Sequence, residues 1–237
     1  AELTLRERHM KHLARMGVAG LVLVASPMAI AQMKGQGDWN GLHKVETKRF
    51  DEAWLLPGAD FKTYTRVMID PTEAAFRKNW QKDWNDKHFD FNERITDEEA
   101  RRILTAAQSG FQDVFTKAYQ EAGYQVVTTP GPDVLRLKTY ILNLDVSAPD
   151  FQKSNVRTYS KEGGSGVLVL EARDSMSGAL LAQGVDGREI GDSAWAMRRT
   201  KLSNRADFEA AFKTWAQMSV DGLAALKTLP PVAIGRN

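Results

Sequence analysis

The sequence predicts an α+β protein with a mainly antiparallel sheet of about five strands and two amphipathic helices packed on one face of it. Apolar residues recur with the period of a helix over about 97–122 and 206–228. Runs of strand length, rich in β-branched and aromatic residues, lie before and between these two segments. Consecutive strands with short links favour antiparallel pairing, and two helices can then cover one face of the sheet.

The segment 97–122 carries the clearest helix pattern of the chain. Thr96 and Glu99 have the spacing of a capping box, in which each side chain binds the other's free backbone N–H. Gly123 supplies the left-handed residue that ends the helix. The second helix, over about 206–228, has an apolar face from Phe208 to Leu226 and stops before two prolines.

Five further segments have the composition of strands, and they cover 61–69, 124–129, 134–146, 166–173 and 179–186. The five residues 174–178 join the last two segments, which predicts a β-hairpin. The stretch 73–92 is aromatic-rich and has no clear period. We therefore expect one α+β domain over 60–228, after a flexible lead-in over 32–59 and before a tail over 229–237.

Residues 10–31 have the three-part order of a secretory signal peptide. Basic residues at Lys11 and Arg15 precede an apolar run over 18–28, which is followed by the small-residue pattern ending at Ala31. This order predicts cleavage after Ala31 and a periplasmic location. The alternative is an amphipathic or buried N-terminal helix. The apolar run is too short to span a bilayer, so we expect no transmembrane span in the mature chain.

Composition narrows the possible functions. The 237 residues include 32 Lys and Arg, 30 Asp and Glu, and no cysteine. The absence of cysteine excludes a disulfide scaffold, a thiolate zinc site, a cysteine nucleophile and a lipid anchor on cysteine. The first 31 residues hold four of the basic and two of the acidic residues, which leaves 28 of each sign in 32–237. This balance argues against a nucleic-acid partner.

Carboxylates are the first candidates for chemistry, because two of them converging could act as an acid and base pair on a glycan or peptide. Five of them lie on or beside predicted strands: Asp133, Asp145, Glu171, Asp174 and Asp186. The alternative is that they cap turns and pair with basic residues across strands.

Other catalytic and binding patterns are weak. The mature chain has only His43 and His88, and no nucleophile elbow. Asp86, His88 and Asp90 alternate as the ligands of a divalent ion could, but we interpret this segment as a solvated loop. The glycine-rich residues 163–166 lack the Lys-Ser/Thr of a phosphate loop, so we expect neither a metal nor another cofactor. A basic trio could meet an acidic partner or anionic headgroups, and it consists of Arg198, Arg199 and Lys201.

An aromatic segment interleaved with charges is the strongest candidate for a partner surface, and it contains Trp80, Trp84, Phe89 and Phe91. Its partner would be an envelope protein or a second copy of the chain. The alternative is that these rings pack over an open end of the sheet.

Three motifs occur in order along the chain: GPDVLRL over 131–137, LEARDSxSG over 170–178 and AFxxWA over 211–216. Together they resemble the exported proteobacterial family called domain of unknown function 3313. The residues that carry the resemblance include Pro132, Asp133, Arg136, Glu171, Arg173, Asp174, Gly178 and Trp215. The resemblance implies export and gives no activity. We expect a non-enzymatic binding or assembly module, with a small-ligand carrier or a hydrolase as alternatives.

Overall fold

The structure is a computed structural model that describes residues 38–39, 41–88, 94–147, 158–160, 162–191, 197–199 and 201–230. The predicted signal peptide over 10–31 and two residues of the aromatic segment, Phe89 and Phe91, lie outside the described residues. No helix among the described residues is long and apolar enough to cross a membrane.

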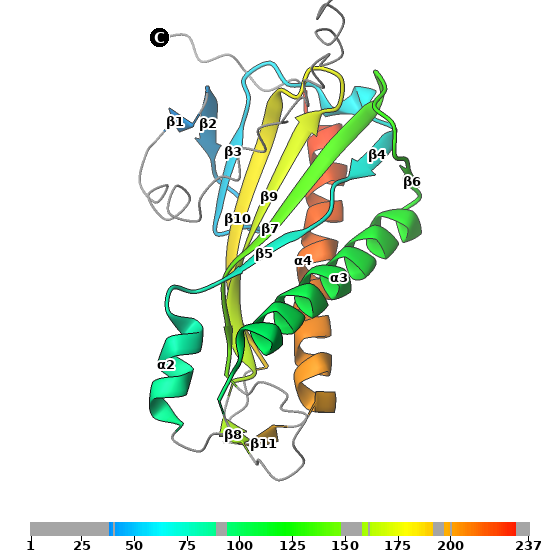
Figure 1. Ribbon diagram of the computed structural model, residues 1–237. Coiled ribbons are helices and arrows are strands. Elements are labelled where there is room, and N and C mark those ends of the chain that lie inside the picture. The colour runs from blue at the N-terminus through cyan, green and yellow to red at the C-terminus, as the bar shows by residue number, and fades with distance from the viewer. Residues whose placement is uncertain are drawn as a thin grey trace, which may run out of the picture. The chain divides into compact units, whose positions relative to one another are not determined.

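In the described part of the chain, nine strands form one sheet, in the order β1-β2-β3-β10-β9-β7-β4-β6, with β5 also pairing with β7 (Figure 1). Their bounds are β1 Asp38–Trp39, β2 Leu42–Val45, β3 Glu52–Leu55, β4 Arg66–Ile69, β5 Glu73–Phe76, β6 Gln125–Val126, β7 Val134–Val146, β9 Gly164–Asp174 and β10 Leu180–Ile190. A separate two-stranded sheet pairs β8 (Thr158–Ser160) with β11 (Met197–Arg199). The predicted mixed α and β content is confirmed, whereas the prediction of about five strands is wrong.

The pairing is mixed. From β1 to β7 every neighbouring pair is antiparallel, but β4 and β5 both run parallel to β7, and β6 runs parallel to β4. The prediction treated 61–69 as one strand, whereas the first part is a 3-10 turn, η1 Phe61–Thr63, and only 66–69 pair in the sheet. Residues 42–45 and 52–55 were expected in a flexible lead-in, which is wrong for them because they hydrogen-bond into the sheet through β10.

Three α-helices lie within the described residues: α2 Trp80–Lys87, α3 Asp97–Glu121 and α4 Lys201–Thr228. The predicted capping box of α3 is confirmed, since Thr96 Oγ1 accepts from the Glu99 N–H and Glu99 accepts from the Thr96 N–H. Helix α4 begins at Lys201, before the predicted start at about 206. Helix α2 was missed, and its N-cap residue Asn79 makes no side-chain cap that a sequence pattern could reveal.

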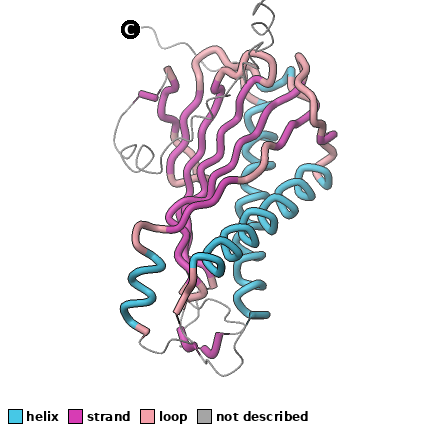
Figure 2. Tube along the Cα trace, in the orientation of Figure 1, coloured by secondary structure: helices cyan, strands magenta, loops and turns pink. Residues whose placement is uncertain are grey.

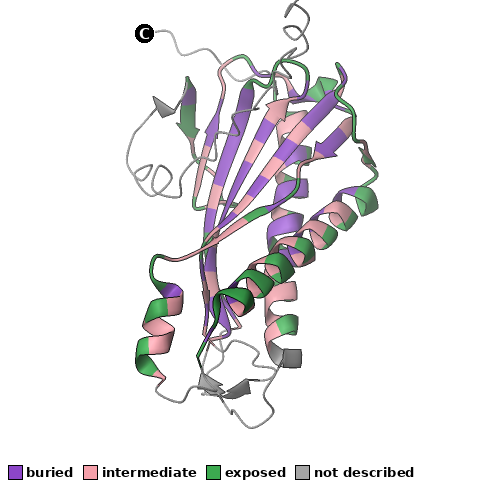
Figure 3. Cartoon of the chain, viewed as in Figure 1, coloured by how far each residue is buried: buried purple, intermediate pink, exposed green. Residues whose placement is uncertain are grey.

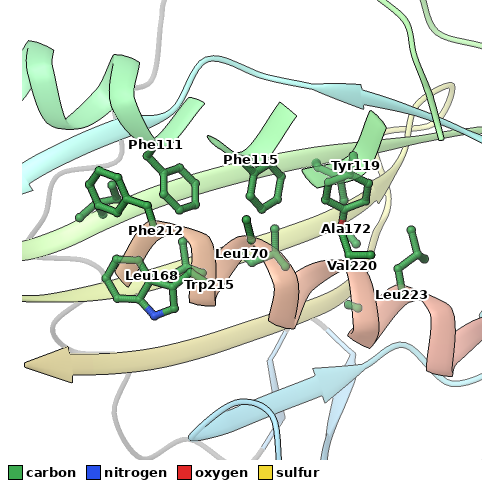
Figure 4. Close-up of a cluster of buried hydrophobic side chains, with 14 of the residues drawn as sticks. Phe111, Phe115, Tyr119, Leu168, Leu170, Ala172, Phe212, Trp215, Val220 and Leu223 are labelled. Carbon is green, nitrogen blue, oxygen red and sulfur yellow. The ribbon is translucent and has the colours of Figure 1, made fainter. Parts of the chain in front are cut away.

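Helices α3 and α4 pack on one face of the sheet, as predicted. Aromatic rings of both helices meet the inward side chains of β9, which include Leu168, Leu170 and Ala172 (Figure 4). Phe111 contacts Phe212 edge to face, with ring centroids 5.3 Å apart, and Phe115 and Trp215 are fully buried. Burial of these large apolar groups is the main source of stability for this layer.

A bulge near the C-terminal end of β7 sets the geometry of that end of the sheet. Asn143 adopts a left-handed conformation with φ of 51°, and the register with β9 shifts between Leu142 and Asp145. The extra residue keeps Leu144 buried while Asp145 forms an ion pair with Arg77, the residue that leads into α2. The bulge therefore positions the connection on which α2 depends.

The other face of the sheet carries no helix among the described residues. Figure 2 shows the long strands β7, β9 and β10 side by side, and α4 passes behind them in this view. Figure 3 shows buried and half-buried residues alternating along much of β7 and β9, as expected for strands with one face in the core. We call the side of the sheet away from α3 and α4 the open face.

Candidate functional site

The open face presents an ordered array of polar side chains. On β7, Arg136, Lys138 and Tyr140 alternate with buried Leu135 and Leu137, so the polar residues share the open face. The register places Arg136 directly opposite Arg173 of β9, and Lys138 directly opposite Glu171. Directly opposite residues on neighbouring strands point to the same side, so these side chains form two adjacent rows.

Two carboxylates accept hydrogen bonds from the Nε atoms of Arg136 and Arg173. Asp70, which follows β4, accepts from Arg136 Nε at 2.9 and 3.0 Å, and its Oδ2 lies 3.7 Å from Lys138 Nζ. Glu171 Oε2 accepts from Arg173 Nε at 2.9 Å. The side chains of Asp70 and Glu171 are only 18% and 14% exposed. The array therefore contains three cations and two shielded carboxylates, and the exposed Glu73 of β5 lies opposite Tyr140 as a third carboxylate.

Neither arginine uses its full hydrogen-bonding capacity on its carboxylate. Arg136 gives only Nε to Asp70, and Arg173 gives Nε to Glu171 and Nη1 to the Gly178 carbonyl at 2.9 Å. Among the described residues, Nη1 and Nη2 of Arg136 and Nη2 of Arg173 have no acceptor. The neighbouring Arg66 differs, because it gives both Nε and Nη2 to the two oxygens of Asp133.

The environment of Tyr140 shows how shielded the array is. The pKa of Tyr140 is raised to about 12, mainly because partial burial desolvates the phenol and to a smaller extent because the charges of Glu171 and Glu73 are nearby. The phenol therefore stays protonated at neutral pH, with an O–H available to donate.

A turn cluster beside the array contains other residues of the family motifs. Asp133 accepts from Arg66 and from Thr65, and these contacts hold the pKa of its carboxyl well below its ordinary value. Ser175 lies buried against both the N–H and the carbonyl of Gly131, at 3.1 and 2.9 Å. Gly178, with φ of 73°, closes the β9–β10 hairpin. The cluster fixes the turn that leads into β7.

The third motif serves the helix layer. Trp215 of α4 is fully buried, and its Nε1 donates to Asp186 of β10 at 2.8 Å. Arg188 completes the group with Nε 2.7 Å from the same carboxylate oxygen. These contacts fix α4 against β10.

The three motifs thus come together on one sheet and the helix that packs on it. A family model for proteins of unknown function, DUF3313, matches residues 32–219. The chain belongs to this family. The predicted membership is confirmed, and in this DUF3313 protein the matched residues include the whole open-face array.

Two solved structures similar to this DUF3313 protein share little sequence with it. A PelC dodecamer from Paraburkholderia phytofirmans is 10% identical and covers 70% of this chain and 95% of its own, with a TM-score of 0.34. A DUF330 protein from Xanthomonas campestris is 10% identical and covers 73% of this chain and 88% of its own, with a TM-score of 0.36. No curated protein matches the sequence. None of these structures lends its function to this chain.

The five candidate carboxylates are all engaged. Two of them, Asp133 and Glu171, pair with arginines on the open face, and Asp145 pairs with Arg77. Asp174 accepts from the hydroxyl and the N–H of Ser177 and, at 3.0 Å, from the Tyr64 hydroxyl, and these contacts lower its pKa. Asp186 is held by Trp215 and Arg188, as described above. A general acid needs a raised pKa, and the shifts at Asp133 and Asp174 have the opposite sign.

The aromatic segment divides between core and surface. Trp80 is only 2% exposed, stacks on Phe76 with ring centroids 3.9 Å apart, and donates from Nε1 to the Val146 carbonyl. The indole of Trp80 is therefore packed in the core and is not available as a contact surface. Trp84 is half-buried and stacks on His88 at 4.1 Å. Phe89 and Phe91 lie outside the described residues.

The remaining candidate residues are separated or lie outside the described part of the chain. Asp86 pairs with Lys82, His88 Nδ1 lies 2.8 Å from the Trp84 carbonyl, and Asp90 is not among the described residues. His43 is exposed on β2. Among the described residues no group of three or more acidic, histidine or cysteine side chains could hold a metal ion. Arg198, Arg199 and Lys201 belong to β11 and α4 by their backbone, but their side chains are not among those that the structure describes.

The glycine-rich stretch 163–166 enters β9 and is not a loop. A Cβ on Gly164 would lie 2.1 Å from the Asp145 carbonyl oxygen and 3.0 Å from Phe208. The glycine is required by this close approach of two backbones. The stretch is a packing feature of the sheet.

Sequence reasoning missed Asp70, Lys138 and Tyr140 as members of the array. The signal was present in β7, where Arg136, Lys138 and Tyr140 occur at every second position of an otherwise apolar run. Asp70 had no comparable signal, because its place beside Arg136 depends on the parallel pairing of β4 with β7.

Proposed function

We propose that this chain is an exported, non-enzymatic binding or assembly module of the bacterial cell envelope that contacts its partner through the open face. The observation that carries the proposal is the array on that face. The side chains of Arg136, Lys138 and Arg173 keep 36%, 33% and 27% of their surface accessible. Helices α3 and α4 cover only the opposite face.

The engagement of the carboxylates supports a binding role over a hydrolase. Paired catalytic carboxylates need one group with a raised pKa and room for a water or a sugar ring between them. Asp133 and Asp174 have lowered pKa values, and each accepts several hydrogen bonds from its own neighbours.

The packing of the helix layer weighs against a small-ligand carrier. Such a carrier would need an apolar space between helices and sheet. The rings of Phe111, Phe115, Phe212 and Trp215 lie there with centroids 5.3 to 6.3 Å apart and interlock above β9 (Figure 4).

Export is part of the proposal and has its own test. The order of basic, apolar and small residues over 10–31 supports a signal peptide that is cleaved after Ala31. Expression of the full chain with fractionation of the envelope should recover a periplasmic protein whose N-terminal residue is Gln32. A protein retained in the cytoplasm with residues 10–31 intact would contradict export.

Site-specific photo-crosslinking in living cells tests the contact surface. A photoreactive phenylalanine analogue at Tyr140 places the probe in the array, and the same analogue at Ser109, exposed on α3, is the matched control. We expect one dominant product from Tyr140 and none from Ser109. A product of twice the mass of the chain would identify self-association, and a different mass would identify an envelope partner. Equal labelling from both positions would refute the open face as the contact surface.

A further inference from the structure

The open face places two like charges directly opposite each other. Arg136 and Arg173 are cross-strand partners on antiparallel β7 and β9, so they are direct neighbours on one face of the sheet. Directly opposed like charges destabilise a sheet. Asp70 and Glu171 offset part of this cost by binding the two Nε atoms.

The carboxylates leave the outer nitrogens of the guanidinium groups available. A carboxylate commonly takes two nitrogens of an arginine in a fork, as Asp133 does with Arg66. Asp70 instead receives only Nε of Arg136, and its second cationic neighbour is Lys138. Nη1 and Nη2 of Arg136 and Nη2 of Arg173 therefore remain as donors without an acceptor among the described residues.

We propose that Arg136 and Arg173 together bind an oxyanion, a phosphate or a carboxylate group of the ligand or partner. The bound anion would accept from the free Nη nitrogens of both arginines and neutralise the repulsion between them. Lys138 adds a third cation beside the pair, and the phenol of Tyr140 is the next donor along β7. This inference rests on the proposed use of the open face as the contact surface.

The chemistry of the array favours an oxyanion over a neutral ligand. Asp70 and Glu171 already accept from the arginines, and the unused nitrogens of Arg136 and Arg173 carry positive charge and can only donate. Planar guanidinium groups recognise the oxygen pairs of carboxylates and phosphates, and the resulting charge-assisted hydrogen bonds are stronger than those between neutral groups. The same group could belong to a free anion or to the headgroup of a lipid.

Titration of the full chain tests the site directly. Inorganic phosphate and acetate would be added at neutral pH and constant ionic strength, while NMR spectra of the ¹⁵N-labelled protein follow the Arg136 and Arg173 signals. We expect a saturable shift of both arginines with one of the two anions. Arg136→Gln and Arg173→Gln should each weaken binding by about tenfold or more, since each removes charge-assisted hydrogen bonds. A response that is linear and identical for sodium chloride would overturn the proposal.

Two further variants separate a specific site from general charge. Lys44→Gln removes a cation that lies on the same face and pairs with Glu52. The affinity of this variant for the anion should equal that of the wild type. Arg173→Lys keeps the charge but loses the fork, so we expect a loss smaller than for Arg173→Gln. Equal losses in Lys44→Gln and Arg136→Gln would overturn the site. Circular dichroism of each variant verifies its fold.

The source of the anion is decided by a second pair of probes. Vesicles of phosphatidylcholine with added phosphatidylglycerol are compared with vesicles of phosphatidylcholine alone. Binding to the anionic vesicles that is lost in Arg136→Gln assigns a lipid headgroup, whereas phosphate or acetate binding without vesicle binding assigns a free or protein-borne anion. If crosslinking from Tyr140 succeeds but neither anion binds, the oxyanion site fails and the binding module stands. Saturable anion binding without a crosslink from Tyr140 would support the oxyanion site and contradict the open face as the contact surface of a binding module.

Discussion

The indole nitrogen of Trp215 lies 2.8 Å from a carboxylate oxygen of Asp186, and both side chains are buried between α4 and β10. We expect Trp215→Phe to lower the free energy of unfolding by about 1–3 kcal/mol, because a buried carboxylate loses a donor. Urea unfolding measures the change. The effect should shrink in an Asp186→Ala background, since a double-mutant cycle isolates the pair. An unchanged effect in that background would show that ring packing alone explains the loss.

Two glycines should respond to alanine with opposite sign. Gly164→Ala forces a Cβ to within 2.1 Å of the Asp145 carbonyl oxygen, so we expect a loss of about 1–3 kcal/mol or more from overpacking. Gly110, inside α3, has Phe212 at an ordinary 3.7 Å, and Gly110→Ala should stabilise by about 0.5–1 kcal/mol through helix propensity. Thermal unfolding of both variants checks the prediction, and stabilisation by Gly164→Ala would contradict the close approach.

Acid should weaken the turn that leads into β7. The pKa of Asp133 is lowered by its hydrogen bonds to Arg66 and Thr65, so the contribution of this carboxylate is fully present above its ordinary pKa of about 3.9. The contribution is lost as the pH falls below that value towards the lowered folded pKa. Asp133→Asn should therefore lose less stability than the wild type between mildly and strongly acidic pH. Asp113→Asn, an exposed site on α3, serves as the control and should follow the wild type.

Two amide side chains of α2, Asn85 and Gln81, attach this helix to the start of α3, and Asn85 binds both backbone groups of Ile95. Asn85 accepts from the N–H of Ile95 at 2.7 Å and donates to its carbonyl at 3.0 Å, which ties α2 to the start of α3. We expect Asn85→Ala to speed hydrogen exchange in α2 by a factor equivalent to about 1–3 kcal/mol, with little change at β7. Lys82→Ala removes only an exposed pair with Asp86 and should leave the exchange of α2 nearly unchanged. Equal protection in both variants would refute the role of Asn85.

The success of sequence reasoning depended on how local the signal was. The predicted bounds of β7 coincide with the structure, and the capping box of α3 is present, because each depends on residues close together in the chain. Helix α2 begins at a left-handed Asn79 without a side-chain cap, so its start had no pattern to recognise. The aromatic segment shows the same limit, since Trp80 is buried partly against the carbonyl of Val146, which belongs to a strand distant in the sequence.

The α+β class, the two long amphipathic helices, the long strand β7 and the family of the chain could all be derived from the sequence. These follow from periodicity and short motifs, which are local properties of the chain. The parallel pairing of β4 and β5 with β7, and with it the contact of Asp70 with Arg136, depends on the tertiary structure. The position of Arg136 opposite Arg173 also depends on the tertiary structure, because register comes from the pairing of whole strands and not from any one of them.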